Sequence, residues 1–197
     1  MATQANKAMV SEVYICNQAL SWAGAIRITS LDGRSDEAEW CRDNYEFIRD
    51  AVLEERMWTF ATARTISTSE DLDDWDQYYR HSVPLEWLSV RGVFTDAEYT
   101  VPDYWRREGQ YILAEDTTLY LWGLKRVVNT AQFSNMFIQA LVTRLAAEMS
   151  VPLTGDTKKA AYYNALYEKR LQEAAILDGM QGTGDELPMN DLVVVRR

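Results

Sequence analysis

The stretch QFSNMFIQALVTRLAAEMS, residues 132–150, decides how the rest of the chain is interpreted. Its large apolar residues recur every four positions, which places them on one face of a helix that other elements must cover. They are Phe133, Phe137, Leu141, Leu145 and Met149. Pro152 cannot continue the hydrogen-bond ladder of a helix, so we expect this helix to end near Ser150. A final helix with one apolar face is expected from about Thr157 to Met180.

Two more helices are expected towards the N-terminus. The first covers about Val10 to Ala23, with apolar residues at helical spacing. The second begins after Ser35, a good N-cap, and ends near Met57. Its apolar stripe is formed by Cys41, Tyr45, Ile48 and Val52. Trp58, directly behind it, is expected to anchor the core.

Between the helical parts, the pattern changes to short runs rich in β-branched and aromatic residues. The runs are Leu85–Val93, Tyr111–Leu113 and Leu119–Trp122. We therefore predict an inserted antiparallel sheet over residues 83–128. The preceding stretch, Ser67 to Tyr79, is polar and acidic, and we expect a loop there.

The predicted fold class is α+β, mainly α: an antiparallel helix bundle with a small inserted antiparallel β-sheet and an extended C-terminal tail. The two halves of the helical domain are predicted at residues 1–82 and 129–180. The inserted sheet is predicted at residues 83–128 and the tail at residues 181–197. The tail contains one lone β-prone run, Leu192, Val193, Val194 and Val195. This run can join the domain's own sheet, add to the sheet of a neighbouring subunit, or stay disordered.

Composition and charge narrow the function classes. The formal net charge of −10 repels phosphate, which argues against sequence-specific DNA binding and leaves only passive, non-specific contact with DNA. Seven tryptophans and eleven tyrosines are many for 197 residues, and such rings favour protein interfaces as well as cores. Cys16 and Cys41 are expected to be reduced core thiols. We expect neither a membrane span nor a secretion signal, hence synthesis in a cytoplasm.

The search for catalytic chemistry identifies no catalytic, cofactor-binding or metal-binding residues. The acidic run Glu70, Asp71, Asp73, Asp74 and Asp76 only partly matches a calcium loop, and we interpret it as a solvated loop. His81 is the only histidine, so a nucleophile has no evident base, and we expect a surface or loop histidine. Trp75, Tyr78 and Tyr79 beside the acidic run leave open a sugar-binding platform and a carbohydrate-cleaving hydrolase.

Two small basic pairs, Arg106 with Arg107 and Lys125 with Arg126, remain as candidate contact residues. They can meet phosphate or an acidic partner subunit, or they can simply be solvated charges at a sheet edge. Together with the Leu192–Val195 run, they are the candidate interface with other protein subunits.

The order of short motifs along residues 10–180 carries a family resemblance. The motif Trp58-Thr59-Phe60-Ala61, followed by Arg64, is its most characteristic piece. The others are Asn17–Leu20 with Gly24 and Ile28, Ser30–Asp32, Cys41 with Tyr45, Arg49-Asp50 and Leu53, Val83-Pro84, Tyr111–Leu113, Leu119–Leu121, Phe133-Ser134 with Phe137, Ala140-Leu141, Arg144–Glu148 and Leu153–Gly155. In these residues the chain resembles tail tubular protein A, the head-to-tail adaptor family of short-tailed bacteriophages.

This resemblance implies a structural virion protein and not an enzyme. It implies a ring of twelve copies between the portal and the tail nozzle, with the helical parts side by side around the channel through which DNA leaves. The protein would be made in the host cytoplasm and reside at the head–tail junction of the virion. The segment from Val93 to Tyr111 and the tail after Gly182 fall outside the resemblance. Another helical assembly module remains an alternative.

Overall fold

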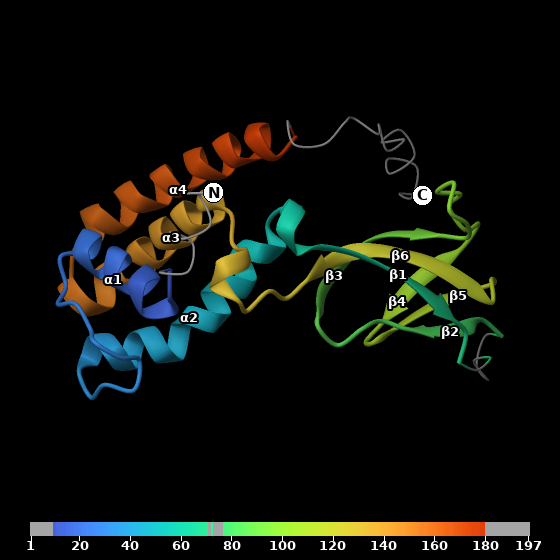
Figure 1. Ribbon diagram of the computed structural model, residues 1–197, viewed down its shortest axis with the longest axis horizontal. Helices are drawn as coiled ribbons and strands as arrows, with labels where there is room; N and C mark the ends of the chain where they lie inside the picture. The colour runs from blue at the N-terminus through green and yellow to red at the C-terminus, as the bar shows by residue number, and fades with distance from the viewer. Residues whose placement is uncertain (1–9, 71, 73–76, 180–197) are drawn as a thin grey trace, which may run out of the picture.

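The computed structural model describes residues 10–179, apart from residues 71 and 73–76. It has helices at one end and two three-stranded antiparallel sheets at the other (Figure 1). In chain order the elements are α1 (Glu12–Ala23), α2 (Asp36–Glu54), η2 (Thr59–Ala61), β1 (Thr62–Thr68), β2 (Tyr79–Ser82), β3 (Trp87–Phe94), β4 (Trp105–Glu108), β5 (Tyr111–Ala114), β6 (Thr118–Lys125), η3 (Thr130–Gln132), α3 (Asn135–Thr154) and α4 (Thr157–Gly179). The α+β class is confirmed, and so is an antiparallel insertion between two pairs of helices.

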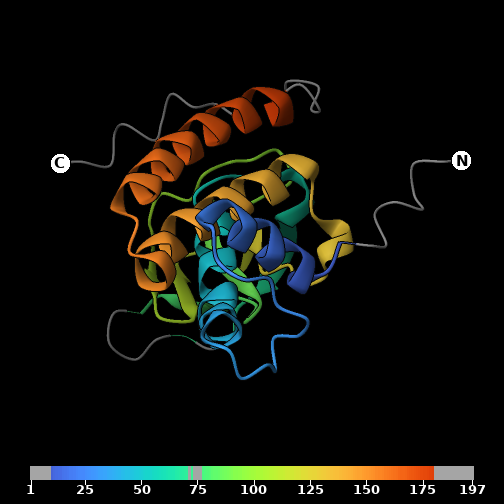
Figure 2. The same cartoon turned by 90° about the vertical axis from the view of Figure 1, so that its left-hand side faces the viewer.

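The predicted apolar stripe of α3 forms the centre of the helical part. Helix α3 packs against α1, α2 and α4, and all five residues of its stripe are buried. The view along the helical end shows α4 on one side of this layer and α2 on the other (Figure 2). Trp58 closes the core as predicted: it is 1% exposed, and its indole Nε1 donates to the carbonyl of Val52 at 2.9 Å.

Helix ends agree closely with the sequence prediction at three of the four helices. The hydroxyl oxygens of Ser11, Ser35 and Ser134 accept hydrogen bonds from backbone N–H groups in the first turns of α1, α2 and α3. The prediction that α3 ends near Ser150 was wrong, because the helix runs through Pro152 to Thr154.

Pro152 is tolerated because it lies in the last turn of α3. The helix ends instead at Gly155, whose left-handed backbone (φ 67°) lets its N–H donate to Val151 and that of Asp156 donate to Ser150. A side chain at Gly155 would be strained in this conformation. The short turn that follows brings α4 back along α3.

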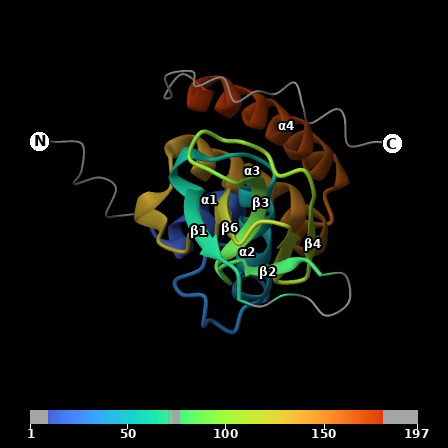
Figure 3. The ribbon, with the colours of Figure 1, turned by 90° about the vertical axis from the view of Figure 1, so that its right-hand side faces the viewer.

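The strands form two sheets stacked as a sandwich, seen from its own end in Figure 3. One sheet has the order β1-β6-β3 and the other β2-β5-β4. The facing sides share a small core of Val83, Trp87, Val93, Ile112, Ala114, Leu119 and Leu121. This core is separate from the much larger helical core. The chain therefore folds around two hydrophobic centres.

The predicted start of the sheet region at residue 83 was wrong. Strand β1 already begins at Thr62, and β2 covers Tyr79–Ser82. The sequence of β1, TARTIST, has four β-branched residues, but three of them are polar threonines and only Ile66 is large and apolar, so it lacks an apolar alternation. Five of the thirteen residues of the predicted Ser67–Tyr79 loop lie outside the described residues: Asp71, Asp73, Asp74, Trp75 and Asp76.

The prediction of a surface or loop position for His81 was also wrong. His81 is 0% exposed in β2, between the two sheets. Its Nδ1 lies 3.2 Å from the carbonyl oxygen of Ser67 in β1, and its Nε2 lies 2.8 Å from that of Asp116. The ring therefore links β2 to β1 and to the turn before β6, and strand alternation turns it inward.

The helical part and the sandwich meet at a narrow junction through which β1 and β6 connect them (Figure 1). Arg126, just after β6, places its Nε 2.6 Å from Asp50 Oδ2 on α2. Asp50 also pairs with the buried Arg49 at 2.9 Å, so one carboxylate serves two guanidinium groups. The side chain of Arg91 in β3 donates to the carbonyl of Glu54.

Helix α3 is the one helix in the described part of the chain that is long and apolar enough to cross a membrane. By that criterion, the expectation of no such segment was wrong. More than half of its most apolar window is buried against the other helices, however, as in the core helix of a globular fold.

Candidate interaction site

The outer face of the β1-β6-β3 sheet carries a cluster of large side chains. In β6, Leu119 and Leu121 face the sandwich core, so strand alternation turns Tyr120 and Trp122 outward. The strand register then places Arg64 opposite Trp122, and Ile66 and Phe94 on either side of Tyr120. Because cross-strand partners share a face, these five residues form one surface, here called the aromatic face.

The loop after β3 folds Tyr99 back onto the aromatic face. Tyr99 adopts a left-handed backbone (φ 66°), which is uncommon for a bulky residue. Its ring meets Phe94 edge-on with centroids 5.1 Å apart, and the Arg64 guanidinium lies 5.5 Å from its centroid. The loop thus holds an aromatic ring and a cation in one arrangement.

Asp96 holds this loop in shape. Its Oδ1 accepts hydrogen bonds from the backbone N–H groups of Glu98 at 2.9 Å and Thr100 at 3.0 Å. Hydrogen bonds from the Thr100 side chain and backbone lower the pKa of the Asp96 carboxyl. The site therefore contains a fixed carboxylate as well as the Arg64 cation.

Gly92 allows the rings to lie close to the strands. A Cβ on Gly92 would come within 2.7 Å of the Phe94 ring and 3.4 Å of Trp122. An alanine there would push the Phe94 ring away from the face. The absence of a side chain at this position therefore shapes the site.

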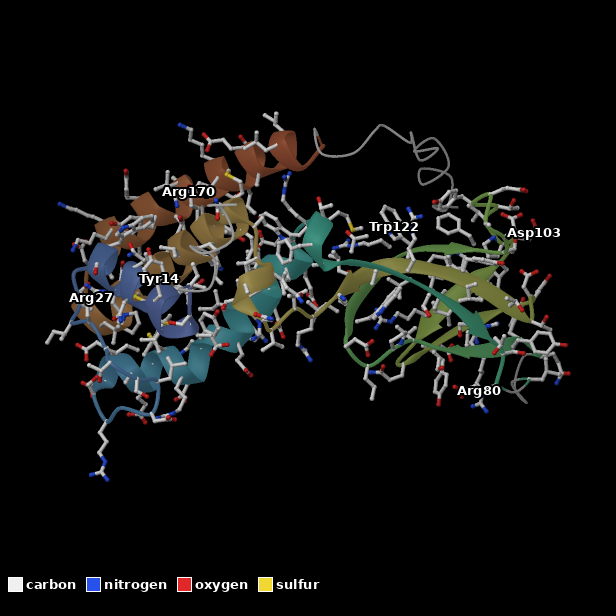
Figure 4. All side chains as sticks on the ribbon, viewed as in Figure 1. Tyr14, Arg27, Arg80, Asp103, Trp122 and Arg170 are labelled. Atoms are coloured by element: carbon white, nitrogen blue, oxygen red, sulfur yellow. The ribbon has the colours of Figure 1, made fainter. Side chains whose placement is uncertain are left out.

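Together, the aromatic face, Asp96 and Tyr99 line a cavity of 320 Å³. Figure 4 shows Trp122 on one side of the sandwich and Arg80 on the other. The buried indole Nε1 of Trp122 makes no hydrogen bond to the described residues. The cavity combines stacking surfaces with one cation and one anion, a composition that suits the binding of another chain's side chains.

The residues that line the cavity can stack against aromatic rings and form ion pairs. Among these residues, no nucleophile lies beside a general base. The single histidine, His81, is buried between the sheets with its two ring nitrogens close to two carbonyl oxygens, and a ring with one N–H can donate to one of them. Cys16 and Cys41 are free and buried in the helical core, as predicted. A hydrogen bond to Cys41, together with burial, raises the pKa of the Cys16 thiol, which keeps it protonated. Among the residues described, no group of histidine, cysteine and acidic side chains could hold a metal ion.

The two predicted basic pairs do not come together. Arg106 and Arg107 lie on β4 in one sheet, whereas Lys125 ends β6 in the other. Arg106 pairs with Glu108 at 2.8 Å and lies 6.0 Å from the Tyr78 ring centroid. Arg107 donates to the carbonyl of Gly109 at 3.3 Å. Arg106 and Arg107 therefore lie on the edge strand β4 and form no joint basic patch with Lys125.

Arg126 serves the junction with α2 and is engaged by Asp50, as described above. The predicted contact run of Leu192, Val193, Val194 and Val195 lies outside the described residues. Of the predicted contact residues, Arg106, Arg107 and Lys125 therefore lie on the sandwich, with Arg106 paired to Glu108.

The aromatic face itself was missed at the level of sequence, although a signal was present. Leu119-Tyr120-Leu121-Trp122 alternates two leucines with two aromatic residues. With the leucines inside, alternation predicts Tyr120 and Trp122 on the opposite face. The contribution of Arg64 could not be predicted in the same way, because β1 itself was not recognised.

Comparison with family models gives no match for this chain, and comparison with curated proteins gives none either.

Proposed function

We propose that this chain is a structural virion protein, a head-to-tail adaptor that forms a ring between portal and tail nozzle and lines the DNA exit channel. The proposal rests on the sequence resemblance. The observation that best supports it is the position of the resembling residues in the fold: they are structural residues spread over both hydrophobic centres and their junction.

Three of these residues show the pattern in the helical part. Asn17 is buried on α1; its Nδ2 donates to the carbonyl of Ile28 at 2.8 Å, and its Oδ1 accepts the Ile28 N–H at 2.7 Å. Gly24, with φ 85°, ends α1 in the left-handed conformation. These contacts fix the connection between α1 and α2.

The most characteristic motif lies where the helices meet the sandwich. The Trp58 ring meets Phe137 of α3 edge-on, with centroids 5.1 Å apart. Phe60 packs against the same Phe137 at 5.2 Å, and Arg64 follows on β1 and reaches the aromatic face. Because these residues lie in the core and at the junction, the resemblance concerns the whole fold. This is what we expect of a structural protein.

In the proposed assembly, the four helices act as an antiparallel bundle that packs side by side with its neighbours in a ring of twelve. The sandwich and the extended tail face the portal and the nozzle, with Arg106, Arg107 and Lys125 among the contact residues. The aromatic face supplies the kind of ring-rich surface that dominates binding energy at protein interfaces. The net charge of −10 lets DNA pass with little adhesion.

The decisive test is light scattering of the pure protein, alone and with the portal ring of the phage that encodes it. We expect a complex with one copy per portal subunit. As a matched pair, Trp122→Ala should weaken a complex that uses the aromatic face, and Tyr14→Ala, at a partly exposed position on α1, should not. A protein that remains monomeric and ignores the portal would contradict the proposal, and a screen for polysaccharide hydrolysis would follow.

A further inference from the structure

Helices α2 and α4 lie on opposite sides of the helical layer, with α1 and α3 between them (Figure 2). Each buries one face against α3 and exposes the other. Both helices also run in the same direction along the molecule, from the outer end of the helical part towards the sandwich (Figure 1). The protomer therefore presents two different, roughly parallel helix faces on its two sides.

The exposed face of α2 is acidic and has one large apolar residue at its centre. Phe47 is 76% exposed, although it is aromatic. Residues four, seven and eleven positions apart lie on the same helix face, and, apart from Ala51, the exposed residues at these spacings from Phe47 are carboxylates. They are Asp36, Asp43 and Glu54. Arg42 is the one exposed cation on this helix, and Glu39 and Asp43 flank it at 3.8 and 3.4 Å.

The exposed face of α4 has the complementary composition. Its outward residues follow the three–four spacing of a helical stripe and are Lys158, Tyr162, Ala165, Lys169, Gln172 and Ile176. Tyr162 is 63% exposed and Ile176 is 67% exposed. The two lysines lie at the surface, and Glu173, four positions after Lys169 on the same face, pairs with Lys169 at 3.8 Å, so this stripe keeps a small net positive charge beside aromatic and aliphatic side chains.

The spacing of the two stripes also matches. Lys158 and Lys169 are as far apart in sequence as Asp43 and Glu54, about 16 Å along a helix. When the two helices are aligned in parallel with each lysine opposite a carboxylate, Tyr162 falls opposite Phe47. The two most exposed aromatic residues of the helical part then cover each other between two ion pairs.

We propose that α4 of one copy docks in parallel on α2 of the next copy, with Tyr162 against Phe47 and Lys158 and Lys169 facing Asp43 and Glu54. This inference rests on the proposed ring and names the surface that repeats around it. The two patches differ and lie on opposite sides of the protomer, so the contact is heterologous and not a symmetric dimer, and the proposed ring requires that the rotation between neighbouring copies closes.

Disulfide trapping tests this pairing directly, because the chain's own Cys16 and Cys41 are buried and do not compete. Phe47→Cys combined with Tyr162→Cys, assembled with the portal ring and mildly oxidised, should give a ladder of covalently joined copies. Either single variant should give no ladder. The matched control combines Phe47→Cys with Ile26→Cys, which is 74% exposed outside the proposed contact. Dimers from Phe47→Cys alone, or a ladder from the control only, would overturn the pairing.

A charge exchange separates this inference from the adaptor proposal. Lys158→Glu with Lys169→Glu should weaken association between copies by about tenfold or more, and so should Asp43→Lys with Glu54→Lys. Combining all four changes should restore it. If the wild type forms its complex with the portal and these variants behave like it, the α2–α4 contact is wrong and the adaptor stands. If the wild type neither assembles nor binds the portal, the adaptor proposal itself fails.

Discussion

The helical part and the sandwich of this protein are built in different ways. The helical part has one large core filled by periodic stripes from all four helices, and most of its contacts are apolar. The sandwich has a core of seven buried residues and also depends on a buried histidine and on the shape of a loop. The first region is held by packing, whereas the second depends more on individual polar contacts. The predictions below test that difference.

The largest effect is expected from Trp58→Ala in the helical core. Trp58 is 1% exposed, donates to Val52 and packs on Phe137, so its removal leaves a large cavity. We expect a loss of about 3–5 kcal/mol in the free energy of unfolding, measured by chemical denaturation. Ile26→Ala, at a surface position, is the control and should change it by less than about 0.5 kcal/mol. A loss below about 1 kcal/mol for Trp58→Ala would contradict a packed core.

The next effect concerns the sandwich. A ring with one N–H can donate to either the Ser67 or the Asp116 carbonyl group, and His81→Leu removes that donor, which is costly because a buried acceptor is left without a partner. We expect a loss of about 2 kcal/mol, seen by hydrogen exchange as faster opening of β1 and β2 while α3 changes little. His81→Gln, which keeps a donor, should lose less. Equal losses for both variants would mean that His81 acts by packing alone, and the contrast between the regions would weaken.

Alkaline pH should act mainly on the helical part, through Tyr45 and Tyr167. Burial raises the pKa of both phenols above the usual value of about 10, and at Tyr167 the hydrogen bond to Glu55 adds to this effect. Because the folded state keeps these protons longer than the unfolded state, their stability contribution is full below about pH 10 and is lost as pH rises further. Either Tyr→Phe variant should flatten this loss in unfolding experiments across that range.

At neutral pH the two tyrosine variants should differ. Tyr167→Phe removes a 2.7 Å hydrogen bond to Glu55 and should lose about 1 kcal/mol. The Tyr45 hydroxyl has no hydrogen-bond partner among the described residues, so Tyr45→Phe should be neutral or slightly stabilising. A destabilised Tyr45→Phe protein would show that this hydroxyl is satisfied in solution.

The smallest effect is expected at the junction between the two regions. Arg126→Ala removes the surface ion pair with Asp50, which is worth about 0–1 kcal/mol. Arg42→Ala, whose pairs lie within α2 alone, is the matched control. In Arg126→Ala, and not in Arg42→Ala, the amide hydrogens of β6 should exchange more independently of those of α3. Identical exchange in both variants would mean that β1 and β6 alone couple the two regions.

The sequence predicted the structure best where the interacting residues lie close together along the chain. Helix signals are local: the stripes of α2 and α3, the serine N-caps and Gly24 could all be identified within a few residues of each element. The final helix was predicted to begin at about Thr157, where α4 begins. These signals were sufficient because a helix satisfies its own backbone and needs only one covered face.

Strand signals depend on distant partners, and here the sequence was less informative. Strand β1 was missed because its partner, β6, is far along the chain: Thr62 lies opposite Leu124. The stretch from Val151 to Asp156 was expected to break the helix, but Pro152 was given more weight than Gly155, which in fact ends α3. For the candidate site, Tyr120 and Trp122 could have been placed on one face by alternation, but Arg64 and Tyr99 join them only through strand pairing and the loop fold.

The sequence by itself therefore determined the helices, the Ser35 N-cap, the free thiols and the presence of an antiparallel insertion. Only the tertiary structure decided which sheet face stays open, that His81 is buried, that Arg126 is engaged by Asp50, and that α2 and α4 expose complementary faces. The physical reason is that periodicity assigns a side chain to a face. Whether that face is covered depends on which distant element packs there.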